Sequence, residues 1–297
     1  MTDLFDGFAE RRLTIDGQDI AFVEAGAGPA VLLLHGFPQN RAMWARIAPR
    51  LVASGYRAVA ADLRGYGASG QPDWVADGSN HSFRAMGRDM AGLMSALGAS
   101  RFHIVAHDRG ARVAHRMALD LPDRVASVTL MDILPTIRLL EGFDLPLARA
   151  YWHWTFLAQP EPFPETLIGA DPDHFFETCL LGWGAARPED FDQGQMAAYR
   201  AAWRRPEVIA GMCRDYRAAL TADLACDRAD SGRRIAAPAL ILWGDRGVMA
   251  GLYDVAAEWA PFCDRMAGQA LPGGHFFPDE CPDLVAERVL SFLSEQP

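Results

Sequence analysis

The chain has 297 residues, half of them hydrophobic, and a formal net charge of −10 at pH 7. This length and composition can bury a large core, and we expect one α/β domain with an insertion. The negative charge argues against nucleic acid and anionic membranes as partners. An anionic small substrate would need local cations to bind.

The five cysteines are odd in number, scattered along the chain and without a C-x-x-C pair. This pattern favours reduced thiols in a cytoplasmic protein. The first residues contain no pattern of a signal peptide, and no apolar run approaches ~20 residues. We therefore expect a protein that does not span or bind a membrane.

The opening residues, 11–24, alternate and predict an antiparallel hairpin before Gly26-Ala-Gly-Pro29. Further strands are predicted at 30–34, 56–61, 102–106, 126–131, 239–243 and about 265–271. Helices are predicted at about 40–53, 82–97, 112–119, 251–259 and 282–293. Strands that alternate with helices predict an α/β fold with a mostly parallel twisted sheet, helices on both faces, and ligands at the carboxyl ends of the strands.

The alternation stops between residue 135 and about residue 234, where aromatic residues and prolines are frequent. We expect this region, 135–234, to be a helical cap (a lid) inserted over the sheet. Residues 1–134 and 235–297 then form the core.

The turn around Asp108 organises the chain, because it joins a buried strand to a helix. Ala106, Asp108 and Gly110 occupy the three defined positions of the nucleophile elbow G-x-S-x-G. A tight turn with small neighbours holds the apical side chain outward in a strained conformation. Asp108 is therefore the candidate nucleophile, and the alternative is an Asp that only caps the following helix.

Asp108, Asp132 and His275 follow the chain order nucleophile, acid, base of the α/β-hydrolase fold. His275 comes after the last predicted strand, in a glycine loop from which an imidazole can reach the elbow. Both Asp132 and Asp245 follow strands and could orient this histidine. Their spacing does not choose between them.

A carboxylate nucleophile is already ionised at neutral pH and suits displacement at a saturated carbon. The resulting ester of Asp108 is hydrolysed by water that His275 deprotonates. The backbone N–H groups of Phe37 and Arg109 are the natural donors to the oxyanion. Dehalogenation and epoxide opening both fit this scheme.

Arg109 and Arg112 flank the candidate nucleophile and narrow the substrate class. Two guanidiniums lower the pKa of Asp108 and can also bind a substrate carboxylate. The alternative is a pair of structural salt bridges. A 2-haloacid would use both features, with its carboxylate on the arginines and its α-carbon facing Asp108.

These motifs resemble those of the fluoroacetate dehalogenases, a haloacetate-hydrolysing branch of the α/β hydrolases. The matching segments are His35-Gly-Phe-Pro38, Asp62-Leu-Arg-Gly-Tyr-Gly67, His107-Asp-Arg-Gly-Ala-Arg112, His115-Arg-Met-Ala118, Asp132-Ile-Leu-Pro-Thr136, His153-Trp154 and Gly273-Gly-His275. The resemblance implies that Asp108 is the nucleophile, Asp132 the orienting acid and His275 the base. It also implies that Arg109 and Arg112 bind the carboxylate, and it favours Asp132 over Asp245.

The same resemblance implies that the departing halide receives hydrogen bonds from His153, Trp154 and Tyr216, and that Trp183 shapes the pocket. Donors of this kind can replace the strong hydration of fluoride where water is excluded. The alternative for each aromatic residue alone is a role in the core. Ala106 departs from the family pattern, which usually has glycine there.

The sequence therefore predicts a cytoplasmic haloacetate dehalogenase without a metal or organic cofactor, and the family resemblance implies a homodimer. The first rival is an epoxide hydrolase, in which Tyr151, Tyr199 and Tyr216 could protonate the opening oxygen. Paired elbow arginines count against it, because an epoxide carries no charge. The second rival is a non-catalytic ligand receptor on the same fold.

Overall fold

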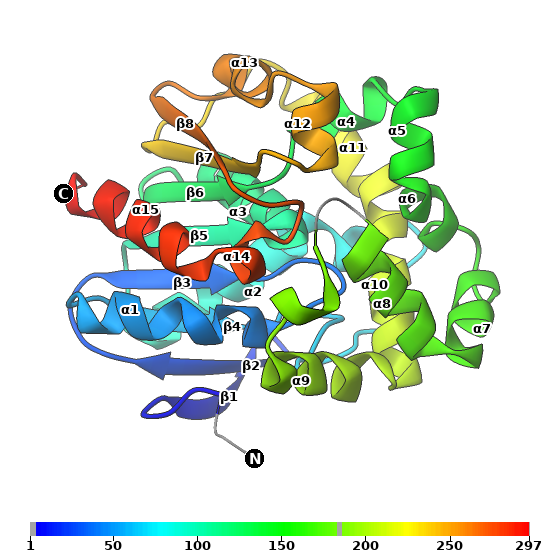
Figure 1. Ribbon diagram of the computed structural model, residues 1–297, viewed down its shortest axis with the longest axis horizontal. Coiled ribbons are helices and arrows are strands. Elements are labelled where there is room, and N and C mark those ends of the chain that lie inside the picture. The colour runs from blue at the N-terminus through cyan, green and yellow to red at the C-terminus, as the bar shows by residue number, and fades with distance from the viewer. Residues whose placement is uncertain (1–3, 183–185, 297) are drawn as a thin grey trace.

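The computed structural model describes residues 4–182 and 186–296. Its eight strands form one sheet in the order β1-β2-β4-β3-β5-β6-β7-β8 (Figure 1). The strands are β1 (Ala9–Ile15), β2 (Gln18–Ala25), β3 (Ala30–Leu34), β4 (Arg57–Ala61), β5 (Phe102–His107), β6 (Val125–Met131), β7 (Ala239–Gly244) and β8 (Met266–Leu271). Pairing is antiparallel for β1 with β2 and for β2 with β4, and parallel elsewhere. The α/β fold, the opening hairpin and the mostly parallel sheet are confirmed.

The centre of the sheet is buried on both faces, as its continuous apolar runs predict. Every residue of β3, β5 and β6 is buried. Ala106 of β5 pairs with Leu34 on one side and Leu130 on the other. This register brings the carboxyl ends of β3, β5 and β6 together at one edge of the sheet.

Helices cover both faces of the sheet, as predicted. In Figure 1, α1 (Ala48–Ala53) and α15 (Pro282–Ser294) lie in front of the sheet, and α2 (Phe83–Ala96) and α3 (Asp108–Asp120) lie behind it. The remaining helical segments of the core are η1 (Arg41–Arg46), η2 (Ser79–His81), α12 (Val248–Leu252), α13 (Val255–Trp259), η5 (Ala260–Phe262) and α14 (Phe277–Glu280).

Two predicted helices are each divided in the structure. The segment expected at 40–53 is a 3₁₀-helix, η1, capped by Asn40, followed after Ile47 by α1. Pro49 stands in the first turn of α1 and has no N–H group to continue the earlier helix. The segment expected at 251–259 divides into α12 and α13, because the Asp254 side chain accepts from Ala257 N and caps a new helix.

The chain between β6 and β7 forms helices, as expected for an insertion. They are α4 (Thr136–Glu141), α5 (Leu145–Ala150), α6 (Trp152–Leu157), α7 (Phe163–Ala170), α8 (Pro172–Gly182), η3 (Pro188–Asp190), α9 (Gln193–Trp203), α10 (Pro206–Ala218), the π-helix η4 (Ala219–Asp223) and α11 (Leu224–Ala229). Figure 1 shows them together beyond one end of the strands. None of the helices in the described part of the chain has the length and apolarity that crossing a membrane requires.

Candidate active site

Asp108 lies at a sharp turn between β5 and α3, with a φ of +46°. Its side chain is buried, with the residue 7% exposed. The turn depends on two glycines. A Cβ on Gly110 would lie 2.4 Å from His35 O, and one on Gly36 would lie 2.4 Å from the Cβ atom of Asp108. Both glycines therefore allow the elbow to approach the turn that follows β3.

Asp108 does not cap α3. His107 occupies the N-cap position of α3, and its side chain makes no hydrogen bond to the first turn. Instead, Asp108 Oδ1 accepts a hydrogen bond of 2.9 Å from the backbone N–H of Phe37. The alternative interpretation of Asp108 as a helix cap is wrong, and the predicted oxyanion donor at Phe37 lies within reach of this carboxyl group.

His275 lies between two carboxylates. Its Nδ1 atom is 2.7 Å from Asp132 Oδ2, and its Nε2 atom is 3.8 Å from Asp108 Oδ2. Asp132 is buried, and its Oδ1 accepts from Gly244 N at 2.9 Å. Asp245 is exposed, and its Oδ1 accepts from Gly273 N at 3.1 Å. The structure therefore brings Asp132, and not Asp245, to His275.

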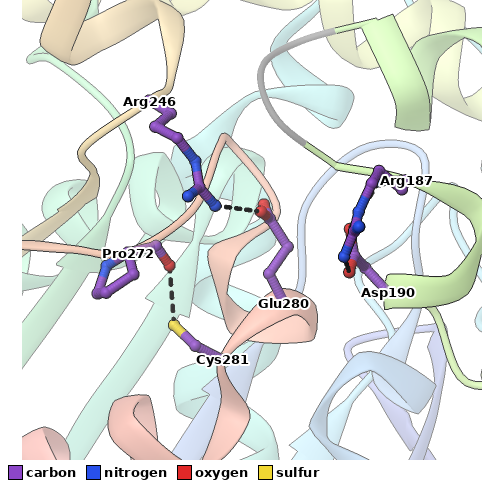
Figure 2. A pocket seen from close by; sticks show the side chains of 6 residues that line it. All are labelled: Arg187, Asp190, Arg246, Pro272, Glu280 and Cys281. Atoms are coloured by element: carbon purple, nitrogen blue, oxygen red, sulfur yellow. Dashed lines mark hydrogen bonds and ion pairs between the residues drawn. The ribbon is translucent and has the colours of Figure 1, made fainter.

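The loop that carries His275 is held by side chains that the sequence analysis did not single out. His107 Nε2 lies 2.8 Å from His275 O, and because a carbonyl only accepts, this ring nitrogen carries the proton. Glu280 Oε1 accepts from Gly274 N at 2.7 Å, and Arg246 lies 3.5 Å from its Oε2 (Figure 2). A surface hollow of about 520 Å³ beside this loop is lined by Arg187, Asp190, Arg246, Pro272, Glu280 and Cys281.

The charges around Asp108 keep it ionised. Burial alone raises the pKa of its carboxyl group, but neighbouring cations outweigh burial and lower this pKa to about 2. His275 lowers it most, and His107, Arg109 and Arg112 follow. The predicted effect of the two guanidiniums is confirmed, but that of His275 is larger.

The pKa of His275 is shifted in the opposite direction from that of Asp108. Burial by itself lowers the pKa of its imidazole, but the hydrogen bond to Asp132 and the charges of Asp132 and Asp108 raise it above its usual value. The ring is therefore a stronger base than a free imidazole.

A buried histidine, His35, holds the turn after β3 that carries Phe37. His35 donates from Nδ1 to Gly36 O at 3.0 Å and accepts at Nε2 from Leu63 N at 3.1 Å. Burial lowers the pKa of this imidazole, which agrees with a neutral ring that donates on one side and accepts on the other. His35 therefore fixes the turn that aims the N–H group of Phe37 at Asp108.

Arg112 is a buried cation without an ion pair among the described residues. The residue is 3% exposed, and its Nη1 donates to Leu134 O at 3.1 Å and to Thr136 Oγ1 at 3.0 Å. Its Nε is buried without a hydrogen-bond partner in this part of the chain. Burial and the charge of Arg109 lower the pKa of this guanidinium to about 10, so it remains charged at neutral pH.

Unlike Arg112, Arg109 forms a fully buried ion pair with Asp215 of α10. The structural salt bridge considered above is therefore present for Arg109, and for Arg112 it is absent within the described residues. Arg109 Nη1 is nevertheless buried without a partner in the described chain. Each arginine thus has a buried nitrogen without a hydrogen-bond partner in the described residues, Nη1 in Arg109 and Nε in Arg112.

The predicted halide donors lie together in the insertion. The rings of His153 and Phe37 stack with centroids 5.9 Å apart, and Tyr216 meets Phe37 edge-on at 5.2 Å. Burial lowers the pKa of His153 well below its usual value, so its ring is neutral. Trp154 contacts Tyr216 edge-on at 5.3 Å. The structure brings all of these predicted residues close to the Asp108 turn.

Trp154 has a feature that the sequence did not predict. Its ring lies 5.0 Å from the Arg109 guanidinium and 4.8 Å from the Arg112 guanidinium. Ring faces attract such cations, so the indole supports both arginines. Trp183 lies outside the described residues.

Comparison with known proteins gives the family of the chain. Residues 29–282 match the model of the α/β-hydrolase fold family. A fluoroacetate dehalogenase from Burkholderia sp is 51% identical over 98% of this chain and 96% of its own length. The chain belongs to the fluoroacetate dehalogenase family of the α/β hydrolases.

Two other similar proteins belong to the wider group of α/β hydrolases and epoxide hydrolases. An α/β hydrolase from Nostoc sp PCC 7120 has a crystal structure that superposes with a TM-score of 0.94 at 44% identity, covering 96% of this chain and 98% of that one. A soluble epoxide hydrolase from Corynebacterium sp. (strain C12) is 29% identical over 94% of this chain and 95% of its own length. The fluoroacetate dehalogenase relative is therefore much more similar than this epoxide hydrolase.

The three tyrosines that an epoxide hydrolase could use, Tyr151, Tyr199 and Tyr216, occupy different environments. Tyr199 of α9 accepts from Gln39 Nε2 at 3.0 Å, and the same amide donates to Asp279 Oδ2 at 2.9 Å. Tyr151 packs edge-on against His153, with ring centroids 5.3 Å apart. Tyr151 and Tyr216 therefore contact the rings around Phe37, whereas Tyr199 packs near Trp203. In the described part of this dehalogenase-family chain, no three His, Cys, Asp or Glu side chains are arranged to hold a metal ion.

Proposed function

We propose that the protein hydrolyses the carbon–halogen bond of a short 2-haloacid, fluoroacetate or chloroacetate, to give glycolate and halide through an ester of Asp108. The observation that carries this proposal is Arg112, a buried cation with no ion pair in the described chain, on the same helix as Asp108. A buried unpaired charge is costly, and an anionic ligand removes that cost.

The substrate carboxylate binds the two elbow arginines. Arg109 Nη1 and Arg112 Nε are buried nitrogens that lack partners in the described residues, and both arginines follow Asp108 within about one turn of α3. Guanidinium groups bind carboxylates through such N–H donors. The net negative charge of the chain makes these local cations necessary.

Displacement needs no proton transfer. Asp108 Oδ1 is held by Phe37 N, which leaves Oδ2 free to attack the α-carbon. A bond forms between Oδ2 and that carbon while the carbon–halogen bond breaks, and the halide leaves with the electron pair and with inversion at carbon. The pKa of about 2 for Asp108 keeps the attacking group ionised.

Hydrolysis of the ester uses His275 as base. Its Nε2 atom takes a proton from water, and the hydroxide oxygen attacks the Asp108 carboxyl carbon. Negative charge develops on Oδ1, where the N–H group of Phe37 donates, joined by that of Arg109. The bond between the carboxyl carbon and Oδ2 then breaks, the imidazolium returns its proton to Oδ2, and glycolate leaves. Asp108 keeps the water oxygen with its second proton, loses that proton to solvent and is again a carboxylate. Asp132 stabilises the imidazolium that forms.

The halide leaves toward the insertion, where His153, Trp154 and Tyr216 donate hydrogen bonds to it. A neutral His153 ring supplies one N–H donor and no net charge. We assign residues 135–234 to a cap that brings these donors to the core, residues 1–134 and 235–297. The homodimer implied by the family resemblance is tested by light scattering in solution.

A halide-selective electrode assay with fluoroacetate, chloroacetate and a small epoxide in parallel tests the function. Halide release from the haloacids, without epoxide opening, supports the dehalogenase. Epoxide opening without halide release would replace it by the epoxide hydrolase. No turnover of any of the three would favour a receptor.

A further inference from the structure

The Arg109 guanidinium is held along one edge by a single residue, Asp215. Arg109 Nε donates to Asp215 Oδ2 at 2.8 Å, and Nη2 donates to Oδ1 and, at 3.1 Å, to the backbone oxygen of Asp215. Both side chains are completely buried. Such a two-point contact fixes the orientation of the planar group as well as its position.

Asp215 is itself fixed from the core. Tyr66 donates from its hydroxyl group to Asp215 Oδ2 at 2.6 Å. Asp215 lies on α10, one residue before Tyr216. The carboxylate thus receives donors from the core on both of its oxygens, and its rotation would break several hydrogen bonds at once.

Aromatic rings close the remaining sides of this guanidinium. Its central carbon lies 4.7 Å from the ring centroid of Phe83, 5.0 Å from that of Trp154 and 4.2 Å from that of Tyr216. Nη1 is the one nitrogen of the group that lacks a partner among the described residues. Ion pair and rings together leave this single nitrogen for a ligand.

We propose that Asp215 is a positioning residue for substrate recognition, which holds Arg109 so that Nη1 is presented to the substrate carboxylate. This inference rests on the proposed function and assigns different tasks to Arg109 and Arg112. Arg109 orients the substrate carboxylate. It adds little net positive charge to the site, because Asp215 already balances its charge. Arg112, which has no ion pair in the described chain, supplies the unbalanced positive charge. The site is therefore set for a substrate with one carboxylate.

Removing the charge of Asp215 separates positioning from simple electrostatics, because the two predict opposite signs. If Asp215 mattered only through its negative charge, Asp215→Asn would strengthen the binding of an anion and lower KM. If it positions Arg109, the amide cannot accept both donors, Nη1 moves, and KM rises. The loss of one charge-assisted hydrogen bond corresponds to roughly a tenfold to hundredfold increase in KM.

The test measures KM and kcat for chloroacetate, with the inhibition constant of neutral fluoroacetamide as the second readout. We expect Asp215→Asn to raise KM for chloroacetate and to change the fluoroacetamide constant less than twofold. The control is Glu207→Gln, which removes an exposed negative charge from the same helix. An unchanged or lower KM in Asp215→Asn would overturn the proposal, as would an equal loss for both ligands.

Two further measurements keep the result decisive if Asp215→Asn does not fold. In the Arg109→Leu background, Asp215→Leu should leave KM unchanged, because Asp215 acts through Arg109; a further rise would contradict this. A crystal structure of Asp108→Asn with chloroacetate should show Arg109 Nη1 bound to the carboxylate and the Asp215 pair intact. A carboxylate bound without Nη1 would overturn the proposal. If the wild type releases no chloride from chloroacetate, the proposed function fails instead.

Discussion

The Nε2 atom of His275 lies 3.8 Å from Asp108 Oδ2, which is beyond hydrogen-bond distance. At this distance the imidazole makes no hydrogen bond to Oδ2, although its charge lowers the pKa of that carboxyl group. In the proposed mechanism the two groups act in different steps, because displacement uses the carboxylate of Asp108 and hydrolysis of the ester uses His275 as the base.

The separation predicts different pH profiles for kcat and kcat/KM. Hydrolysis of the ester requires neutral His275, so kcat should fall about tenfold per pH unit below the pKa of this residue in the ester. That pKa should lie below that of the free enzyme, because the ester removes the negative charge of Asp108. Displacement requires only ionised Asp108, whose pKa is about 2, so kcat/KM should stay level between pH 5 and 8. Parallel falls of both parameters would contradict this division.

Substitution of the base should trap the intermediate. In His275→Asn, displacement proceeds but no side chain deprotonates the water, so an adduct should accumulate on Asp108. Intact-protein mass spectrometry after incubation with chloroacetate should record the added carboxymethyl group. Asp108→Asn is the matched control, and it should form no adduct and release no halide. Continued halide release by His275→Asn without any adduct would show that water attacks the substrate directly.

Arg112→Leu should weaken substrate binding without weakening the fold. The lost charge-assisted hydrogen bonds should raise KM for chloroacetate by roughly thirtyfold to a hundredfold. Removing a buried cation with no ion pair in the described chain should offset the lost bonds to Leu134 O and Thr136 Oγ1, leaving Tm within about 2 °C. Thermal shift and steady-state kinetics check both parts. A large fall in Tm, with unchanged KM, would assign Arg112 to structure.

Glu280 offers a test of the loop that carries His275. Its Oε1 atom accepts from Gly274 N at 2.7 Å, directly before the histidine. Glu280→Ala should lower kcat by about tenfold, because the base loses its fixed position, whereas Glu280→Gln keeps an acceptor and should retain most of the activity. The adduct on Asp108 should persist longer in the Ala variant. Equal losses in both variants would mean that the charge, and not the hydrogen bond to Gly274, matters.

Local patterns in the sequence were sufficient to predict the core of the fold. All the predicted strands are present, and the central ones, β3, β5 and β6, are buried, continuous apolar runs with few alternative interpretations. The elbow was identified from the small residues around Asp108, and Gly110 shows why, since any side chain there would collide with His35 O. These features depend on neighbours close in sequence or on strict strand pairing.

The partners of Arg109 and of the His275 loop could not be predicted in the same way. Asp215 is 106 residues from Arg109, and only the packing of α10 against the core brings the two side chains together. Asp132 and Asp245 both follow strands, so their spacing in the sequence cannot show which of them orients His275. Only the fold shows that Asp132 reaches the imidazole, whereas Asp245 accepts from Gly273 N. Glu280 has no local signal, since its role depends on the chain folding back onto Gly274.

The donors in the insertion should matter more for fluoride than for chloride. Fluoride is small and strongly hydrated, so its departure depends more on hydrogen bonds that replace water. Tyr216→Phe removes only the hydroxyl group and keeps the ring that packs edge-on against Phe37 and over Arg109. We expect kcat for fluoroacetate to fall about tenfold more than kcat for chloroacetate, with fluoride and chloride electrodes as the readout.

Tyr199→Phe is the matched control for this comparison, because Tyr199 is a buried tyrosine of the same insertion that bonds to Gln39. Its substitution should affect both halides equally, through stability alone. If Tyr216→Phe also lowers both rates by the same factor, the Tyr216 hydroxyl group does not bind the leaving halide. The ring would then act only by packing against Phe37 and the Arg109 guanidinium.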